Sequence, residues 1–345
     1  MVFGKLMITM TPVALLFFRV IAENSGRPAA LLLDTGAGDA AALAALAAQL
    51  RESGDEAASL PGLQRAMPCL FRPEPLAGTA LPQVLMDAGW RPLAPGTLCR
   101  VDTRLVVDFL PAGTEWIDGD WCIGPPPRAT GAQAASKVAA LQMVQLVARD
   151  ADTHEIEALL RRDPTLSYNL LRLVNSLGVG GGRRITSFSQ ALLLLGRQQL
   201  RRWLNLMLFA ARQGDVRSAM LLARVAMRAR ALELLAKAQG LDKTTQEQAF
   251  MAGMFSLLGV LFGMPLAEVL APLALGEAVQ GALLRRSGAL GELLSLVEAA
   301  ERGDLDSVAA QLVQLQIARP DYNQAMLDAA CWMQLALREN QAAHV

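Results

Sequence analysis

The stretch DPTLSYNLLRLVNS, residues 163–176, begins with two residues that favour the start of a helix. The carboxylate of Asp163 can accept hydrogen bonds from the free N–H groups of a first turn, and Pro164 suits the first helical position because it has no N–H of its own. Leu170, Leu173 and Val174 follow at helical spacing, so they form an apolar stripe on one side. The stretch predicts an amphipathic helix that packs against other helices.

Similar patterns extend through residues 132–340, with few signs of strands. Ser187 and Gln190 are spaced as in a capping box ahead of the leucine run at 191–195, and Gly196 then interrupts that run. We expect an all-α fold over this part of the chain, with later helices at about 216–238, 244–262, 288–302, 304–318 and 321–340.

The N-terminal part has a different texture. Three prolines at 125–127 mark a boundary, and most of the chain's 17 prolines lie at or before them. An apolar run at 29–33 predicts a buried strand, and an alanine-rich run at about 40–51 predicts a helix. We therefore predict a small α/β domain at 1–127, followed by an all-α domain at 128–345.

Residues 7–22 are the most apolar part of the N-terminal region, but Pro12 and Arg19 interrupt them. A spanning helix needs about 20 consecutive apolar residues. We expect a buried strand or helix here, no membrane span, and a cytoplasmic protein.

The formal net charge is zero, with 32 basic and 32 acidic residues, so the chain lacks the global basic field of a nucleic-acid-binding protein. The four cysteines show no CxxC spacing and have no histidine nearby, so we expect buried, reduced thiols and not a disulfide framework.

Residues 163–176, together with ITSFSQALLLLG at 185–196 and LRRW at 200–203, resemble the HDOD domain in residues, order and spacing. The resemblance extends over about residues 135–340. It implies the fold of HD-domain phosphohydrolases and a role as an output or scaffolding module of bacterial signalling.

The subtype that the chain most resembles joins an HDOD domain to a preceding EAL domain, the barrel of cyclic di-GMP phosphodiesterases. Residues 249–259, 293–303 and the junction GDWCIGP at 119–125 carry this similarity. Residues 1–127, however, have no Glu-X-Leu motif on a predicted strand and about half the length of a typical (β/α)₈ barrel. They are either a degenerate EAL remnant or an unrelated small α/β domain.

The resemblance also locates where an HD enzyme would bind its metal. The family pattern Gly-Leu-Leu-His-Asp-Ile-Gly corresponds to residues 253–259, in which Ser256 replaces the His and Leu257 replaces the Asp. Leucine cannot bind a metal, and the chain has only two histidines, His154 and His344, both outside this segment. We therefore predict no metal site, no cofactor and no catalysis.

Several arginines fall in successive elements of the early helical region. The functional interpretation is a basic patch for an acidic partner, and the alternative is a solvated surface with local ion pairs. The candidates are Arg172, Arg183, Arg184, Arg197, Arg201 and Arg202.

The sequence thus predicts a non-catalytic signal-transduction scaffold that binds an unidentified signalling protein and no nucleic acid. It leaves open whether the chain forms a homodimer. The alternatives are a cyclic di-GMP-related phosphodiesterase and a receptor that binds a cyclic dinucleotide without turnover. We expect structural roles for the remaining residues that match the family pattern, namely Asp163, Pro164, Asn175, Ser187 and Gly196.

Overall fold

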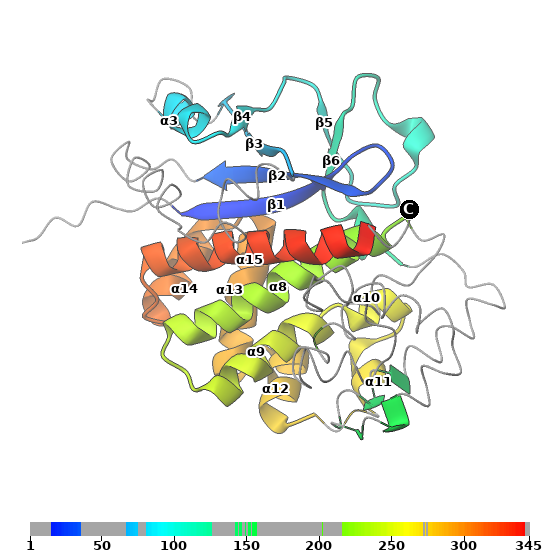
Figure 1. Cartoon of the computed structure of the whole chain (residues 1–345), viewed down its shortest axis with the longest axis vertical. Coiled ribbons are helices and arrows are strands. Elements are labelled where there is room, and N and C mark those ends of the chain that lie inside the picture. Colours follow the sequence, from blue (N-terminus) through cyan, green and yellow to red (C-terminus); the bar gives the residue numbers. More distant parts are fainter. Residues whose placement is uncertain are drawn as a thin grey trace, which may run out of the picture.

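The computed structural model describes residues 15–35, 67–74, 81–125 and 216–341, except 272 and 274, together with Arg202 and several residues between 142 and 156. In this part of the chain, one sheet lies across a set of C-terminal helices (Figure 1). No helix in these ranges is both long enough and apolar enough to cross a membrane.

The sheet has six strands in the order β4-β3-β2-β1-β6-β5. The central strand β1 runs antiparallel to both neighbours, whereas the other adjacent pairs run parallel. Six of its seven residues are buried, as expected for a strand covered on both faces. The strands are β1 Leu16–Ala22, β2 Pro28–Thr35, β3 Cys69–Phe71, β4 Arg91–Pro92, β5 Leu98–Arg100 and β6 Trp116–Asp118.

The helices of the C-terminal part follow the sheet along the chain. Three short elements come before them. The helix α3 Leu81–Asp87 lies near the edge of the sheet, and the two 3-10 helices are η2 Val107–Phe109 and η3 Trp121–Ile123. The C-terminal helices are α8 Ser218–Ala238, α9 Lys243–Phe255, α10 Leu258–Phe262, α11 Leu266–Leu270, α12 Glu277–Arg285, α13 Gly288–Arg302, α14 Leu305–Gln314 and α15 Arg319–Gln341.

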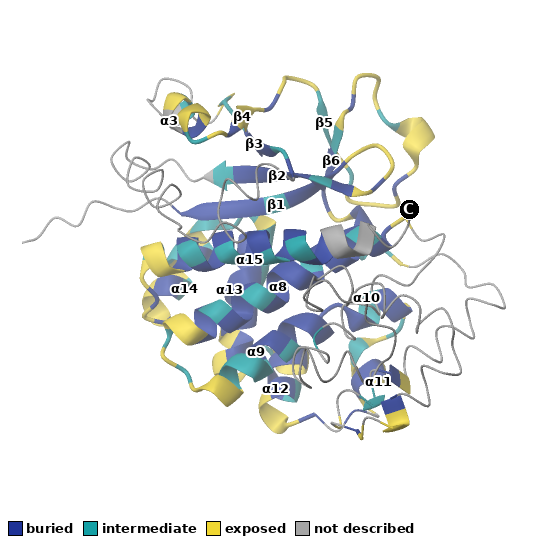
Figure 2. Cartoon of the chain, viewed as in Figure 1, coloured by how far each residue is buried: buried dark blue, intermediate teal, exposed yellow. Residues whose placement is uncertain are grey.

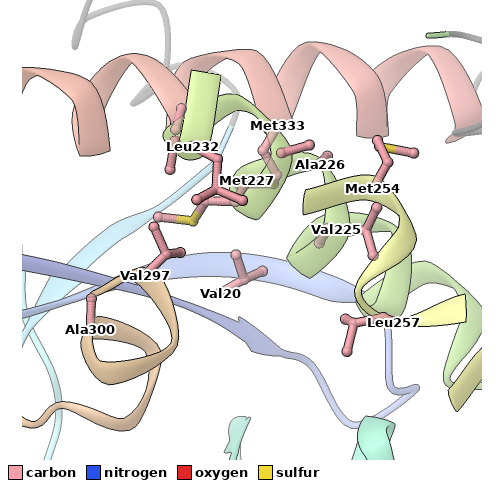
Figure 3. Close-up of a cluster of buried hydrophobic side chains, with 14 of the residues drawn as sticks. Val20, Val225, Ala226, Met227, Leu232, Met254, Leu257, Val297, Ala300 and Met333 are labelled. Carbon is pink, nitrogen blue, oxygen red and sulfur yellow. The ribbon is translucent and has the colours of Figure 1, made fainter. Parts of the chain in front are cut away.

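The sheet and the helices share one hydrophobic core. β1 contacts α15, α13 and α8, and the buried positions of sheet and helices meet along this boundary (Figure 2). Figure 3 shows Val20 of β1 in the same apolar cluster as Met227 of α8 and Val297 of α13. The C-terminal helices therefore cover the apolar face of the N-terminal sheet.

This arrangement corrects the predicted fold class. The expectation of a small α/β domain followed by a separate all-α domain is wrong, because the mixed sheet and the helices bury their apolar residues against each other. The sheet order, with β4 and β5 at its two ends, also gives no support to a degenerate EAL barrel. A sheet must cover its apolar face with another layer, and here that layer comes from the end of the chain.

A buried polar contact ties the first strand to the last helix. Asn323 of α15 accepts a hydrogen bond of 2.9 Å from the backbone N–H of Leu16. The neighbouring Tyr322 is fully buried, and its ring lies 6.4 Å from that of Phe17. The side-chain amide thus satisfies a backbone donor that burial would otherwise leave unpaired.

Several predicted elements are confirmed. The strand expected at 29–33 lies within β2, and the apolar segment at 7–22 contributes β1. The helix predicted at 288–302 has the same bounds as α13. The helix predicted at 40–51 lies outside the described residues.

Candidate functional site

The segment matching the HD pattern lies where α9 ends and α10 begins. At Gly253, α9 approaches α8 so closely that an added Cβ would lie 2.4 Å from the Cα of Ala229. Only glycine permits such a close approach of two helix backbones. This contact brings Ser256, the first residue after α9, up to the side chains of α8.

Ser256 is buried and fully hydrogen-bonded. Its hydroxyl donates to the carbonyl of Gly253 at 2.6 Å and accepts from Nη1 of Arg228 at 2.8 Å. The position that would hold a metal-binding His in an HD enzyme therefore contacts a guanidinium group instead.

Leu257 belongs to the hydrophobic core. Its side chain is 5% exposed. It lies in the apolar cluster that also contains Val225 of α8 and Met254 of α9 (Figure 3). The position of the metal-binding Asp has thus become part of the packing between helices.

Two glutamates on α13 balance the charge of Arg228. Glu301 accepts from Nε and Nη2 of Arg228 at 2.8 and 2.5 Å, and Glu298 lies 3.7 Å from Nη1. Glu298 in turn accepts two hydrogen bonds from Arg286, at 2.9 and 2.8 Å. These side chains form a network that joins α8, α13 and the end of α12, with Ser256 at one side.

The network keeps Arg228 charged. Burial by itself would lower the pKa of this guanidinium, but the Glu301 carboxylate outweighs that effect and raises the pKa above its usual value. A permanent positive charge thus lies beside Ser256. Such a charge repels a divalent cation.

One turn earlier on α8, Arg224 holds the junction between sheet and helices. It donates to the Asp120 carboxylate at 2.9 Å and to the carbonyl of Gly119 at 2.6 Å. Arg217 donates to the carbonyl of Gly124 in the same segment. The junction that follows β6 is therefore tied to α8 by three contacts from arginines.

A second charged cluster lies at the side of the sheet where strands β2, β3 and β6 end. Asp34 near the end of β2 and Asp118 at the end of β6 are both paired with Arg19 of β1, at 2.7 and 3.0 Å. Arg72, which follows β3, lies 3.5 Å from Asp118. Ligands of α/β sheets often bind at the carboxyl ends of strands, but these arginines are neutralised by carboxylates.

These clusters offer no metal centre. Within the ranges that the structure describes, no three His, Cys, Asp or Glu side chains lie close enough together to hold a metal ion.

One arginine of the predicted basic patch can be located. Arg202 donates to Glu233 of α8 at 2.5 and 3.2 Å, and its guanidinium lies 4.3 Å from the centre of the Phe250 ring. Arg230 pairs with the same carboxylate at 2.7 Å. Arg202 thus makes an internal ion pair.

The other predicted residues lie outside the described part of the chain, so the patch stays a prediction. They are Arg172, Arg183, Arg184, Arg197 and Arg201, together with the family-pattern residues Asp163, Pro164, Asn175, Ser187 and Gly196.

Sequence reasoning did not identify Arg228, Glu298 or Glu301. A signal was present, because Arg224 and Arg228 are spaced i, i+4 and every other residue from 219 to 229 in this helix is apolar. Charged residues are rarely fully buried unless they are paired, so an arginine on such a helix indicates a carboxylate partner elsewhere.

Comparison with known proteins shows similarity to one domain family and to two curated proteins. Residues 134–294 match the model of the HDOD domain. The chain is 33% identical over 198 residues to the cyclic di-GMP phosphodiesterase CdgJ of Vibrio cholerae, a match covering 57% of this chain and 45% of CdgJ. It is 29% identical over 178 residues to the uncharacterized protein YuxH of Bacillus subtilis, covering 50% and 42%. The matches thus span less than half of either relative.

A solved structure described as a putative phosphohydrolase from Shewanella amazonensis SB2B also matches. The match covers 59% of this chain and 93% of that one, at 15% identity and a TM-score of 0.42. The family match agrees with the resemblance expected from residues 163–203. Residues 134–294 of this chain are therefore similar to an HDOD domain.

Proposed function

We propose that this protein is a non-catalytic signal-transduction scaffold whose HDOD helices present a surface to another signalling protein. The observation that carries the proposal is the contact between Arg228 and Ser256. A hydrolase of the HD type must place metal ions at this turn, and here a buried guanidinium occupies the polar side of it.

The neighbouring carboxylates support the same conclusion. Glu298 and Glu301 both pair with Arg228, and both already accept hydrogen bonds from arginines. A metal ion would have to break these pairs and overcome the repulsion of Arg228. Leu257 supplies no ligand atom. The turn is therefore suited to the packing of helices and not to metal-dependent hydrolysis.

The name of CdgJ describes a cyclic di-GMP phosphodiesterase, and that activity defines the rival proposal. To separate the two, the full chain would be purified with added Mn²⁺, Mg²⁺ or Fe²⁺, and its metal content and its hydrolysis of cyclic di-GMP measured. CdgJ serves as the positive control. We expect metal content far below one ion per chain and no hydrolysis above the buffer rate. Stoichiometric metal together with turnover would overturn the proposal.

Binding of a cyclic dinucleotide without hydrolysis is the second alternative. The arginines that lie near the carboxyl ends of β2, β5 and β6 are the groups that would bind its phosphates. Arg19 already pairs with Asp34 and Asp118, and Arg100 with Asp102, which disfavours this use. Isothermal titration calorimetry with cyclic di-GMP is therefore expected to give no heat of binding at high micromolar ligand.

The scaffold role itself requires a partner. A signalling protein captured from the source organism would be purified separately and mixed with the full chain. A defined stoichiometry and a saturable affinity are expected for a scaffold. Failure of every captured protein to bind after purification would contradict this half of the proposal.

A further inference from the structure

Two arginines on α8 join the end of the sheet to the segment that matches the HD pattern. Arg224 and Arg228 are spaced i, i+4, so their side chains lie on neighbouring turns of one helix face. Both are largely buried, with side-chain exposures of 16% and 5%. Arg224 contacts residues 119–124, which we call the junction, and Arg228 contacts residues 253–259, which we call the HD turn.

The backbone of the junction is fixed to the end of the sheet. The N–H of Gly119 donates to the side chain of Asp118, the last residue of β6, at 2.8 Å. Gly119 has a φ of 113°, and an added Cβ would lie 2.3 Å from the carbonyl oxygen of Val101, the residue after β5. Arg224 donates to the carbonyl of Gly119 and to the carboxylate of Asp120. The position of its guanidinium therefore depends on how the sheet ends.

Both arginines interact with the carboxylate of Glu301 on α13. Arg228 donates two hydrogen bonds to it, at 2.8 and 2.5 Å. Burial by itself would lower the pKa of Arg224, but Cys122 and the Glu301 carboxylate are among the groups that raise it above its usual value. One carboxylate thus attracts two positive charges, and these repel each other.

Arg228 has a second acidic neighbour. Its Nη1 lies 3.7 Å from the carboxylate of Glu298 and 2.8 Å from the hydroxyl of Ser256. A small rotation of the guanidinium would strengthen the first contact and break the second. The polar side of the HD turn therefore depends on which acceptor Arg228 uses.

We infer that Arg224, Glu301 and Arg228 form a switch that couples the junction to the HD turn. Release of Arg224 from Asp120 lets this arginine bind Glu301. Arg228 then turns toward Glu298 and away from the HD turn. Each guanidinium keeps a carboxylate partner in both states, which is essential because an unpaired buried charge is costly. The inference does not depend on the proposed scaffold function, because it concerns coupling inside the chain.

Amide hydrogen exchange of the full chain, followed by mass spectrometry, tests the inference. Asp120→Ala removes the carboxylate that holds Arg224, and the variant should fold because the Asp120 side chain is 57% exposed. We expect the HD turn to exchange at least about threefold faster than in the unmodified chain, as is typical of coupling between distant sites. Asp108→Ala is the matched control, because Asp108 is an exposed carboxylate on η2, and it should leave this exchange unchanged.

The opposite direction gives a second test. Coupling between two sites is reciprocal, so Glu301→Gln should increase amide exchange in the junction. Glu292→Gln, at an exposed position of the same helix, should not. Combining Asp120→Ala with Glu301→Gln should raise exchange in the HD turn by less than the product of the two single effects, because both changes act on one switch.

Three results would each overturn the inference. The first is an HD turn whose exchange Asp120→Ala leaves unchanged. The second is an equal increase in α14 of that variant, which would indicate general destabilisation. The third is a combined variant in which the two single effects multiply. If Glu301→Gln does not fold, the comparison of Asp120→Ala with Asp108→Ala decides the question.

Discussion

Nη1 of Arg228 lies 2.8 Å from Oγ of Ser256, at the turn where an HD enzyme would carry its metal-binding His. The same guanidinium makes two hydrogen bonds to Glu301. An arginine therefore stabilises the packing of three helices at a position where an HD enzyme would need an open coordination site.

Removing this arginine should destabilise the fold. In Arg228→Met, Glu301 loses its two hydrogen bonds and Ser256 loses a donor. Breaking one side of a largely buried ion pair should lower the free energy of unfolding by roughly 3 kcal/mol. Urea unfolding followed by circular dichroism measures the change. Arg285→Met, at an exposed position of the neighbouring α12, is the control and should change stability by less than about 0.5 kcal/mol. Equal effects at the two positions would contradict the structural role of Arg228.

The close approach of α8 and α9 predicts a cost for a single methyl group. Gly253→Ala would place a Cβ at 2.4 Å from the backbone of Ala229, so the two helices must separate. The expected loss is about 2 kcal/mol, although alanine is otherwise the better helix former. Gly276→Ala is the control, because an added Cβ there meets nothing within 4 Å and its φ is −61°. A Gly253→Ala variant as stable as the unmodified chain would show that the helices are not in tight contact.

Helix caps predict how stability depends on acid pH. The Ser307 hydroxyl hydrogen bond lowers the pKa of Asp304 from its usual 3.8, and the Thr245 hydroxyl does the same for Asp242. A lowered pKa in the folded state means that each carboxylate stabilises the fold above pH 3.8 and loses this effect as the pH falls further. Asp304→Asn keeps a hydrogen-bond acceptor but cannot titrate. Its unfolding free energy should fall less steeply below that pH, and an unchanged slope in a pH series of urea titrations would contradict the assignment.

Thiol reactivity reports on the shared core. Burial raises the pKa of Cys69 in β3 to about 12, and burial raises that of Cys331 in α15 to about 12 as well. Both thiols stay protonated near neutral pH and should resist a thiol-specific reagent until the protein unfolds. Cys99, which is partly exposed, should react first. Peptide mapping by mass spectrometry identifies each modified cysteine. Modification of Cys69 as fast as Cys99 in the native protein would contradict the packing of the sheet on the helices.

Local patterns predicted the helices better than the sheet. The helix at 288–302 was recognisable because its apolar stripe ends at Gly303, which adopts the left-handed conformation with φ 72°. The short helices α11 and α12 were not assigned, since α11 has only five residues and Gly276 and Gly281 interrupt the pattern of α12. The pairing of β1 with β6 joins segments about 95 residues apart, and nothing in either strand specifies that neighbour.

The candidate site was predictable only in part. Ser256 and Leu257 could be identified because the motif places them between two glycines of fixed spacing. Their surroundings could not, because Arg228 and Glu301 come from other helices and are 73 residues apart. The separation into two domains was wrong for a related reason. The break at the prolines is real in the sequence, but whether two segments share a core depends on surfaces far apart along the chain.

The hydrogen bond between Leu16 and Asn323 has a consequence for how the protein is made. The two residues are 307 positions apart, so β1 cannot complete this contact until the last helix has been synthesised. Long-range contacts of this kind close large loops and slow folding. During translation α8, α13 and α15 are therefore not yet available to cover the apolar strand β1 while most of the chain is being synthesised. Release of the C-terminal helix from the ribosome, and not synthesis of the N-terminal strands, sets the moment at which the sheet is protected.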